Sequence, residues 1–305
     1  MNQSKGIILV LLTAIISGIS IFLNAFAVKG FNPFVFTGMK NLIVAVFLIS
    51  LIVLSGQLNS LKNLTRKQWL NLSLIGLIGG SVPFLLYFYA LKLTTASTAG
   101  FLHKTLFVWA SLLAFFFLKE KLSKKLIAGA ILLLTGNFLL FNQTFSFGFP
   151  ELLVLTAVLF WAGENILSKN ALNELSGTVV AGARMFFGSL FILLFLLFSG
   201  QLSLIATHSI DQWSWILLTA FLLFFYVLTY YSGLKHISVS AATSILLLGQ
   251  PITALLSFVF FGQAVSLTEA FGLIMIVFGV LIIAGFSFFL NALKFLGFSF
   301  VSKKN

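Results

Sequence analysis

The sequence contains no cysteine, which excludes disulfide bonds, thiol nucleophiles and cysteine-ligated iron–sulfur clusters. It has three histidines in 305 residues, too few to predict a multi-histidine metal site. Charged residues are scarce as well, at 8% of the chain, where a soluble domain has about 25%. Because so few charges cannot cover a water-facing surface, the composition excludes a soluble domain.

Apolar residues are abundant. They form 60% of the chain, and 38 phenylalanines stand against 5 tyrosines, which indicates aromatic side chains meant for burial. The first five residues lead into an apolar stretch longer than the core of a cleavable signal, so we expect a first spanning helix there. A span needs about 20 apolar residues. The chain is therefore predicted to be an all-α integral membrane protein with ten transmembrane helices, at residues 6–27, 33–55, 68–91, 95–118, 125–142, 150–168, 177–199, 212–234, 239–262 and 267–290.

The basic residues predict which side of the membrane each loop faces. A net charge of +12 would suggest nucleic-acid binding in a soluble protein, but cationic loops of a membrane protein record topology first, so we predict no nucleic-acid partner. Only Lys29 and Lys92 fall in loops on the side away from the N-terminus. The other side carries thirteen cations, which predicts that both termini are cytoplasmic. These are Lys5, Lys62, Arg66, Lys67, Lys119, Lys121, Lys124, Lys125, Lys169, Lys235, Lys294, Lys303 and Lys304.

The chain repeats itself at an offset of 143 to 144 residues. The tetrapeptide SGQL at Ser55–Leu58 recurs at Ser199–Leu202, and in the same register Lys40 matches Arg184. Each half holds five predicted spans, an odd number, so the second half must enter the membrane with opposite polarity. This predicts two inverted repeats, residues 1–142 and 143–305, an architecture typical of secondary transporters.

Motifs in both halves carry a family resemblance. They comprise 233–242, Gln250-Pro251, 261–263 and Gly272 in the second half, their counterparts 90–97, 118–123 and Gly129 in the first, and Phe160-Trp161-Ala162. On these residues, nearly the whole chain resembles the drug/metabolite transporter superfamily, specifically its EamA-type transporters with ten helices. The resemblance implies efflux of metabolites or drugs across the plasma membrane through a pocket between the halves. The chain departs from the family at Val108, where a proline is usual in the fourth helix.

Ionisable groups inside predicted spans are candidates for function, because burying a charge in a bilayer is costly. Lys104 lies about 14 Å into its span, near the midplane. One reading is that its ammonium binds a substrate carboxylate or phosphate, and the other is a structural lysine that is deprotonated or reaches the interface. Lys40 and Arg184 lie shallower, at about 10 Å, and are candidates for coupling or gating, with a side chain that reaches the interface as the alternative for each. Glu164 is predicted either to form a plain ion pair with Arg184 or to serve in gating or proton coupling.

Other polar and aromatic residues within spans complete the candidate site. His103 is a candidate proton acceptor or a hydrogen-bonded structural histidine. We interpret Pro83 and Pro251 as hinges, since proline frees a backbone carbonyl, although a plain kink is equally consistent with each. Five further side chains are candidate pocket-wall or substrate-binding residues, with structural or interfacial roles as the alternative: Gln250, Trp109, Trp161, Tyr87 and Tyr230.

We therefore expect a secondary active transporter, an exporter or exchanger of a small anionic or zwitterionic metabolite such as an amino acid or organic acid. Export of neutral or aromatic compounds or drugs is the alternative. A membrane-embedded lipid-modifying enzyme would need a nucleophile with its base or clustered acids, which six acidic residues do not supply, so no enzyme activity is predicted. Its partners would be the substrate and the bilayer, with protons as a candidate coupling ion. No cofactor or metal is expected, and a homodimer is left open.

Overall fold

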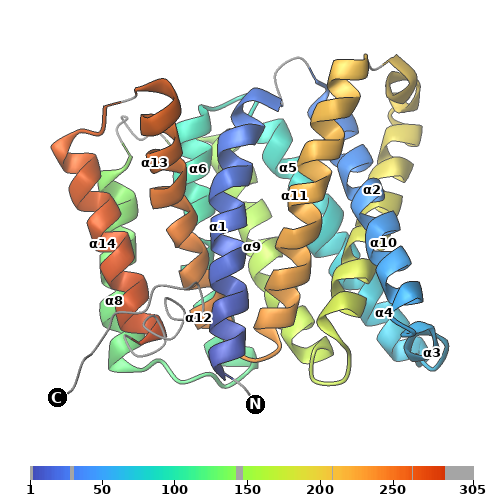
Figure 1. Cartoon of the computed structure of the whole chain (residues 1–305), viewed down its shortest axis with the longest axis horizontal. Coiled ribbons are helices and arrows are strands. Elements are labelled where there is room, and N and C mark those ends of the chain that lie inside the picture. The colour runs from blue at the N-terminus through green and yellow to red at the C-terminus, as the bar shows by residue number, and fades with distance from the viewer. Residues whose placement is uncertain (1–2, 28–30, 142–146, 208, 263, 286–305) are drawn as a thin grey trace, which may run out of the picture.

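The computed structural model describes residues 3–27, 31–141, 147–207, 209–262 and 264–285, and within these ranges it contains helices and no strand (Figure 1). The first half contributes α1 (Gln3–Ala27), α2 (Pro33–Leu54), α3 (Leu58–Lys62), α4 (Arg66–Ile75), the π-helix η1 (Gly76–Ser81), α5 (Val82–Ala90), α6 (Ala96–Lys104), α7 (Leu106–Phe117) and α8 (Lys124–Leu139). The second half contributes α9 (Phe149–Ala171), α10 (Gly177–Phe198), the 3₁₀ helix η2 (Leu202–Thr207), α11 (Ile210–Leu234), α12 (Val239–Ile245), the 3₁₀ helix η3 (Leu246–Leu248), α13 (Gly249–Phe261) and α14 (Leu267–Ala284).

The helices confirm the predicted all-α, multi-pass membrane class. Nine stretches of the described chain are long and apolar enough to cross a membrane. The fifth predicted span corresponds to α8, which is a helix of 16 residues and so falls just short of that length. The tenth predicted span, 267–290, corresponds to α14, and its last five residues lie outside the described ranges.

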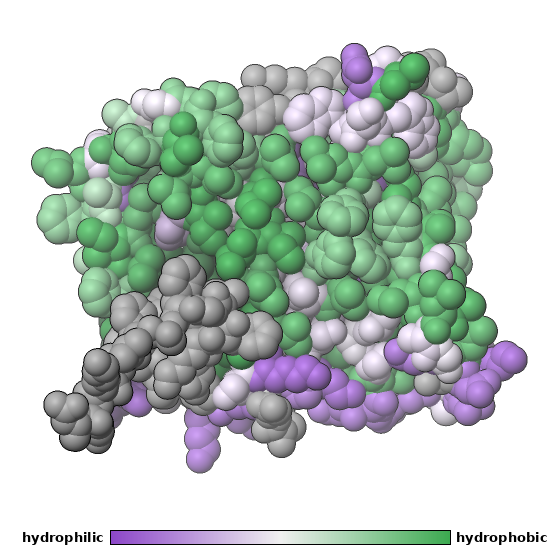
Figure 2. Space-filling model, viewed as in Figure 1, coloured by the Kyte–Doolittle hydropathy of each residue, from purple (hydrophilic) through white to green (hydrophobic). Residues whose placement is uncertain are grey.

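The surface of the bundle is divided by polarity. Figure 2 shows a broad hydrophobic band around the middle of the visible face and hydrophilic residues along its lower edge. The N-terminus, α3 and α4 lie at this lower end in the same view (Figure 1). Since apolar side chains belong in the hydrocarbon core and charged ones outside it, the helix axes cross the membrane plane.

The two halves interleave. Helix α1 packs against α11 and α13 of the other half, and its repeat counterpart α9 packs against α5 and α7. Helix α2 packs on α10, and α8 packs on α14. In the last pair, a side chain on Gly136 would meet the Gly272 carbonyl, and one on Gly129 would meet the Gly279 carbonyl. Glycine is therefore needed where these two backbones touch.

The repeated tetrapeptide has a structural explanation. Gly56 and Gly200 both adopt positive φ, at 71° and 69°, which only glycine reaches without strain. The glutamine that follows each glycine then bonds to the other half. Gln57 Oε1 accepts a 2.8 Å hydrogen bond from Ser176, and Gln201 Oε1 accepts one of 2.8 Å from Asn32.

Ser176 and Asn32 cap the N-termini of α10 and α2. Each half thus places a turn against the start of the other half's second helix. The tetrapeptide therefore recurs because the same contact between the halves is made twice.

Three predicted spans are each divided into shorter helices. The third consists of α4, η1 and α5, and Pro83 stands in the first turn of α5, directly after the π-helix. The ninth consists of α12, η3 and α13, and Pro251 is the third residue of α13. The two predicted hinges therefore lie at helix discontinuities. The fourth span breaks as well, at Thr105 between α6 and α7, without any proline.

We expect Gly136→Ala to lower the thermal stability of the purified protein. The added methyl would lie 2.6 Å from the Gly272 carbonyl and 2.9 Å from Ile276, so α8 and α14 must separate, at a cost of about 1–3 kcal/mol. Gly100→Ala is the matched control, because its methyl would meet no atom within 4 Å. Thermal unfolding in detergent should show a lower midpoint for Gly136→Ala alone. Equal midpoints for the two variants would contradict the close approach.

Candidate functional site

A cavity of about 730 Å³, here called the main cavity, lies between the two halves. Its walls come from α1, α5, α6 and α7 of the first half and from α9, α10, α11, α12 and η3 of the second. Its lining reaches Asn24 near the end of α1 and Leu91 just beyond α5, at the upper end of the bundle in Figure 1. Toward the lower end it stops at Asn165 on α9 and Tyr231 on α11, before those helices end.

Seven of the residues singled out in the sequence line this cavity. They are Tyr87, His103, Lys104, Trp161, Glu164, Arg184 and Tyr230. Segments more than 140 residues apart in the chain therefore bring their polar and aromatic side chains into one space. The volume is in the range of pockets that hold small organic molecules.

One wall of the main cavity is aromatic. The Trp161 ring lies 5.0 Å from the His103 ring and 5.8 Å from the Tyr87 ring, between centroids, and the last two rings are 5.6 Å apart. On the opposite side Tyr226 and Tyr230 stack with a centroid separation of 6.1 Å. Such walls pack well against apolar or ring-bearing groups.

A buried polar cluster closes the lower part of the cavity around Glu164. Its Oε1 accepts hydrogen bonds from the Tyr231 hydroxyl at 2.7 Å and the Ser168 hydroxyl at 2.5 Å. Arg184 Nε lies 4.0 Å from the same oxygen. The carboxylate is 2% exposed, so these three groups replace the water it would otherwise need. The predicted Glu164–Arg184 contact is present.

The π-helix η1 holds this cluster in place. The Gly79 carbonyl accepts hydrogen bonds from Arg184 at 2.8 Å and from the Trp161 indole at 3.1 Å. The next carbonyl, of Gly80, accepts one from Asn41 at 3.1 Å. A side chain at Gly79 would collide with Glu164. The break in the third span therefore supplies both the acceptors and the space that the cluster requires.

Several members of the site were not singled out in the sequence. Tyr230 donates a hydrogen bond to Asn165 Oδ1, and Asn165 Nδ2 donates to the Trp161 carbonyl at 2.8 Å. Tyr231 and Ser168 bind Glu164 as described above. The spacing of Trp161 with Asn165, and of Glu164 with Ser168, places each pair on one face of α9 and is the signal that could have identified them.

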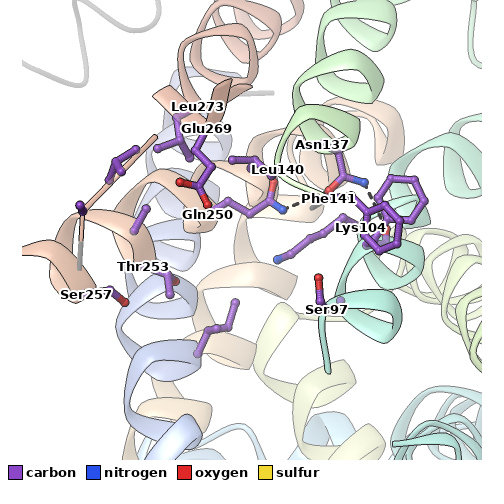
Figure 3. A pocket seen from close by; sticks show the side chains of 16 residues that line it. Ser97, Lys104, Asn137, Leu140, Phe141, Gln250, Thr253, Ser257, Glu269 and Leu273 are labelled. Carbon is purple, nitrogen blue, oxygen red and sulfur yellow. Dashed lines mark hydrogen bonds between the residues drawn. The ribbon is translucent and has the colours of Figure 1, made fainter. Parts of the chain in front are cut away.

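Lys104 also faces a second cavity of about 320 Å³, the side cavity, which is bordered by α1, α6, α8, α13 and α14. Figure 3 shows the Lys104 amine pointing into this space. Across the described ranges, no hydrogen bond or ion pair joins that amine to another residue. Gln250, a predicted substrate-binding residue, lines the side cavity rather than the main one.

The remaining predicted residues lie elsewhere. The Trp109 indole donates to the Thr105 hydroxyl at 3.2 Å and packs into the hydrophobic core. Lys40 is buried outside both cavities, with its amine 5.0 Å from the centre of the Phe36 ring. Pro83 and Pro251 are not among the lining residues of either cavity. In the described ranges, no three His, Asp or Glu side chains come together in a way that could hold a metal ion.

Comparison with known proteins agrees with this architecture. The EamA-like transporter family matches residues 4–142 and 148–285. An uncharacterized transporter of Clostridium kluyveri is 27% identical over 92% of this chain and 93% of its own length. The uncharacterized transporter YetK of Bacillus subtilis is 27% identical over 71% of this chain and 66% of its own. A solved crystal structure superposes with a TM-score of 0.72, covering 90% of this chain and 95% of that one at 21% identity, and at that identity the likeness concerns the fold alone.

We expect Arg184→Met to destabilise the protein by about 3 kcal/mol, because it leaves Glu164 buried without its cation. Adding Glu164→Gln should restore part of the loss, since a neutral amide needs no counter-charge. Lys40→Met is the matched control, as it removes the repeat-equivalent cation, which has no acidic partner among the described residues. Thermal unfolding of five proteins measures the coupling: the unaltered protein, Arg184→Met, Glu164→Gln, the double variant and Lys40→Met. Additive effects of the two cluster substitutions would contradict the pairing.

Proposed function

Because the chain belongs to the EamA-like transporter family, we propose that it is a secondary active transporter, an exporter or exchanger of small anionic or zwitterionic metabolites, working by alternating access. The observation that carries the substrate class is Lys104. Its ammonium has no protein partner among the described residues, yet Lys104 lines both the main cavity and the side cavity. A carboxylate or phosphate on the substrate would provide the missing counter-charge.

The exchanged contacts support two inverted repeats of five spans each, residues 1–142 and 143–305. In an antiparallel pair related by a two-fold axis, a contact between position a of one half and position b of the other must occur twice. The pairs Gln57 with Ser176 and Gln201 with Asn32 have this property. Helix α8, about 24 Å long by its residue count, would be the shortest of the ten crossings.

We place the protein in the plasma membrane, and the charge distribution supports a topology with both termini in the cytoplasm. The hydrophilic lower edge in Figure 2 lies at the end where the chain begins. Lys92, which the sequence assigns to the other side, lies at the opposite end of the bundle, after α5. Under the positive-inside bias the lower end is then cytoplasmic.

The two ends of the bundle are held differently. At the lower end the Lys169 amine donates to the Leu234 and Ile237 carbonyls at 2.6 and 2.7 Å, joining α9 to the end of α11. Lys235 donates in return to the Leu175 carbonyl at 2.8 Å. Its repeat counterpart Lys92, at the upper end, instead lies 5.3 Å from the centre of the Phe34 ring.

The two lysine contacts lie within the second half, whereas a third contact at the lower end joins the two halves. Glu120, in the loop after α7, accepts hydrogen bonds at the start of α12 from the Val239 amide at 2.7 Å and the Ser240 hydroxyl at 2.7 Å. With the lysine contacts it forms a lower latch, composed of Glu120, Lys169 and Lys235. We infer a state in which the main cavity is closed toward the cytoplasm, and transport then requires the latch to open.

The cluster of Glu164, Arg184 and Tyr231 lies between the main cavity and the lower latch, where a change in its hydrogen bonds could couple the two. A proton taken up by Glu164 would weaken its contact with Arg184. The aromatic wall of Tyr87, His103 and Trp161 favours substrates that carry an apolar or ring-bearing group, and it is the observation that keeps neutral aromatic compounds as a second candidate class.

Lys104→Met should reduce transport of anionic or zwitterionic substrates in proteoliposomes at least about tenfold, the cost of one charge-assisted hydrogen bond. Lys40→Met, which removes a buried cation outside both cavities, is the matched control and should transport normally. The assay is uptake of a labelled panel of amino acids and organic acids. Undiminished uptake by Lys104→Met would contradict the proposed substrate class, whereas transport of neutral aromatic compounds alone would favour the second one.

Lys169→Met should loosen the lower latch, because it removes the charged donor to the end of α11. We expect backbone amides of residues 234–239 to exchange with deuterium about tenfold faster or more. The control is Lys67→Met, which alters an exposed lysine on α4, outside the latch. Hydrogen–deuterium exchange with peptide-level readout measures the effect. Unchanged exchange in 234–239 would show that the latch does not hold this end closed.

A further inference from the structure

We propose that the side cavity binds the primary ammonium group of a zwitterionic substrate, whose carboxylate sits on Lys104 and whose side chain extends into the main cavity. The inference rests on the proposed transport function and specifies how the substrate is recognised. It makes Gln250 and Glu269 the residues that distinguish a zwitterion from a plain organic acid.

The two cavities adjoin at Lys104. Ile21, Gly100 and Lys104 line both of them, so a molecule held at the Lys104 amine faces two spaces of different character. The main cavity offers aromatic rings. The side cavity is lined by two side chains that carry hydrogen-bond acceptors, Gln250 and Glu269, and Figure 3 labels both.

A short relay of hydrogen bonds fixes the orientation of the Gln250 amide. Thr105 N bonds to the Leu102 carbonyl at the break after α6, and the Phe101 carbonyl instead accepts from Asn137 Nδ2 at 3.1 Å. A carbonyl can only accept, so the Asn137 amide is fixed with its Oδ1 turned away from Phe101. That oxygen accepts from Gln250 Nε2 at 3.2 Å.

The relay leaves Gln250 Oε1 as a buried acceptor that has no donor among the described residues. Rotating the Gln250 amide would place its oxygen against Asn137 Oδ1, and rotating the Asn137 amide instead would place two NH₂ groups against each other. The orientation of the pair is therefore not free. A buried acceptor without a donor is unfavourable, and a ligand that brings an N–H group relieves it. A simple carboxylate has no N–H group to donate to this acceptor, whereas an ammonium group does.

Glu269 adds a negative charge to the same space. One of its oxygens, Oε2, accepts from the Ser266 amide at 2.8 Å in the capping box of α14. The carboxylate lines the side cavity opposite Lys104 (Figure 3). A cation on one wall and a carboxylate on the other match a molecule that carries both charges, while a plain acid would place its only charge on Lys104 and leave the acceptors unmatched.

A glycine, Gly100, lies where the two cavities adjoin. A side chain built at Gly100 meets no atom within 4 Å, so this position borders empty space and not a packed neighbour. Gly100→Val should fold normally and narrow the passage. It should therefore weaken the binding of zwitterions, which must occupy both cavities, more than the binding of plain acids, which need only one.

Binding to the full-length protein in nanodiscs tests the proposal. The probes are matched sets whose members share one side chain. The first set is L-phenylalanine, 3-phenylpropionate and the N-trimethyl derivative of phenylalanine. Two further sets are built in the same way on the isobutyl side chain of leucine and the carboxyethyl side chain of glutamate. The trimethyl derivatives keep both charges but cannot donate a hydrogen bond. Isothermal titration calorimetry gives Kd for each. In at least one set the amino acid should bind at least about tenfold more tightly than both analogues.

The variants assign that preference to residues. Gln250→Met and Glu269→Gln should each reduce the preference for the ammonium to about threefold or less, with Kd for the plain acid unchanged. Glu269→Gln keeps the helix cap, since glutamine also serves at that position of a capping box. This variant therefore still tests the proposal if Gln250→Met does not fold. Lys104→Met should weaken the binding of the amino acid and of the plain acid alike. Glu174→Gln, which removes a carboxylate outside both cavities, is the control.

The outcomes separate this inference from the proposed function. Equal binding of amino acid and plain acid to the unaltered protein, with both weakened by Lys104→Met, would overturn the side-cavity assignment and leave the proposed function intact. Weakening of both ligands to the same degree by Gln250→Met and Glu269→Gln would overturn it too. If no carboxylate in any set binds, the proposed substrate class fails, and this inference fails with it.

Discussion

Backbone carbonyls that a helix break exposes inside a bilayer must be paired by the protein itself, because hydrocarbon offers no donor. In this structure those carbonyls organise the polar interior. The Gly79 carbonyl in the π-helix binds Arg184 and Trp161, and the Phe101 carbonyl at the end of α6 binds Asn137. Each break thus fixes a side chain of one of the two cavities. Removing the irregular helix would remove the anchor points of the candidate site along with it.

The halves agree where they hold the fold and differ where they line the site. Helix caps, left-handed glycines and the Gln57 and Gln201 contacts follow the repeat closely. The cavity residues do not: at the same offset Lys104 corresponds to Leu247, Glu164 to Ile21, and Gln250 to Phe107. A nearly symmetric scaffold therefore encloses an asymmetric site, in which Lys104 and Glu164 each occur once. Under the proposed alternating access, the symmetry would allow the two ends to exchange roles, and the asymmetry would give the substrate a fixed orientation.

Much of this was predictable from sequence because the signals are local. Apolar length predicted the spans, and the offset repeat identified the recurring tetrapeptide, although not the contacts that it makes. Predictions were weakest where a long-range contact decides the conformation. Thr105 breaks a helix with no proline, and Val108, the position where the family has one, gave no hint of that break. Trp109 lies deep in its span, but a hydrogen bond to Thr105 turns it into the core and away from the cavity. Asn137 carries no charge, so nothing in its own neighbourhood marks it as the link between Phe101 and Gln250.

Alternating access requires that the cavity between the halves open at one end only when it closes at the other. The absence of native cysteine makes single-cysteine labelling a direct test. Leu91→Cys would report on the upper end of the main cavity and Leu175→Cys on the loop held by Lys235. Without substrate, a membrane-impermeant maleimide should label position 91 quickly and position 175 slowly, and saturating substrate should shift the two rates in opposite directions. Rates that rise or fall together, or do not respond to any transported substrate, would contradict alternating access.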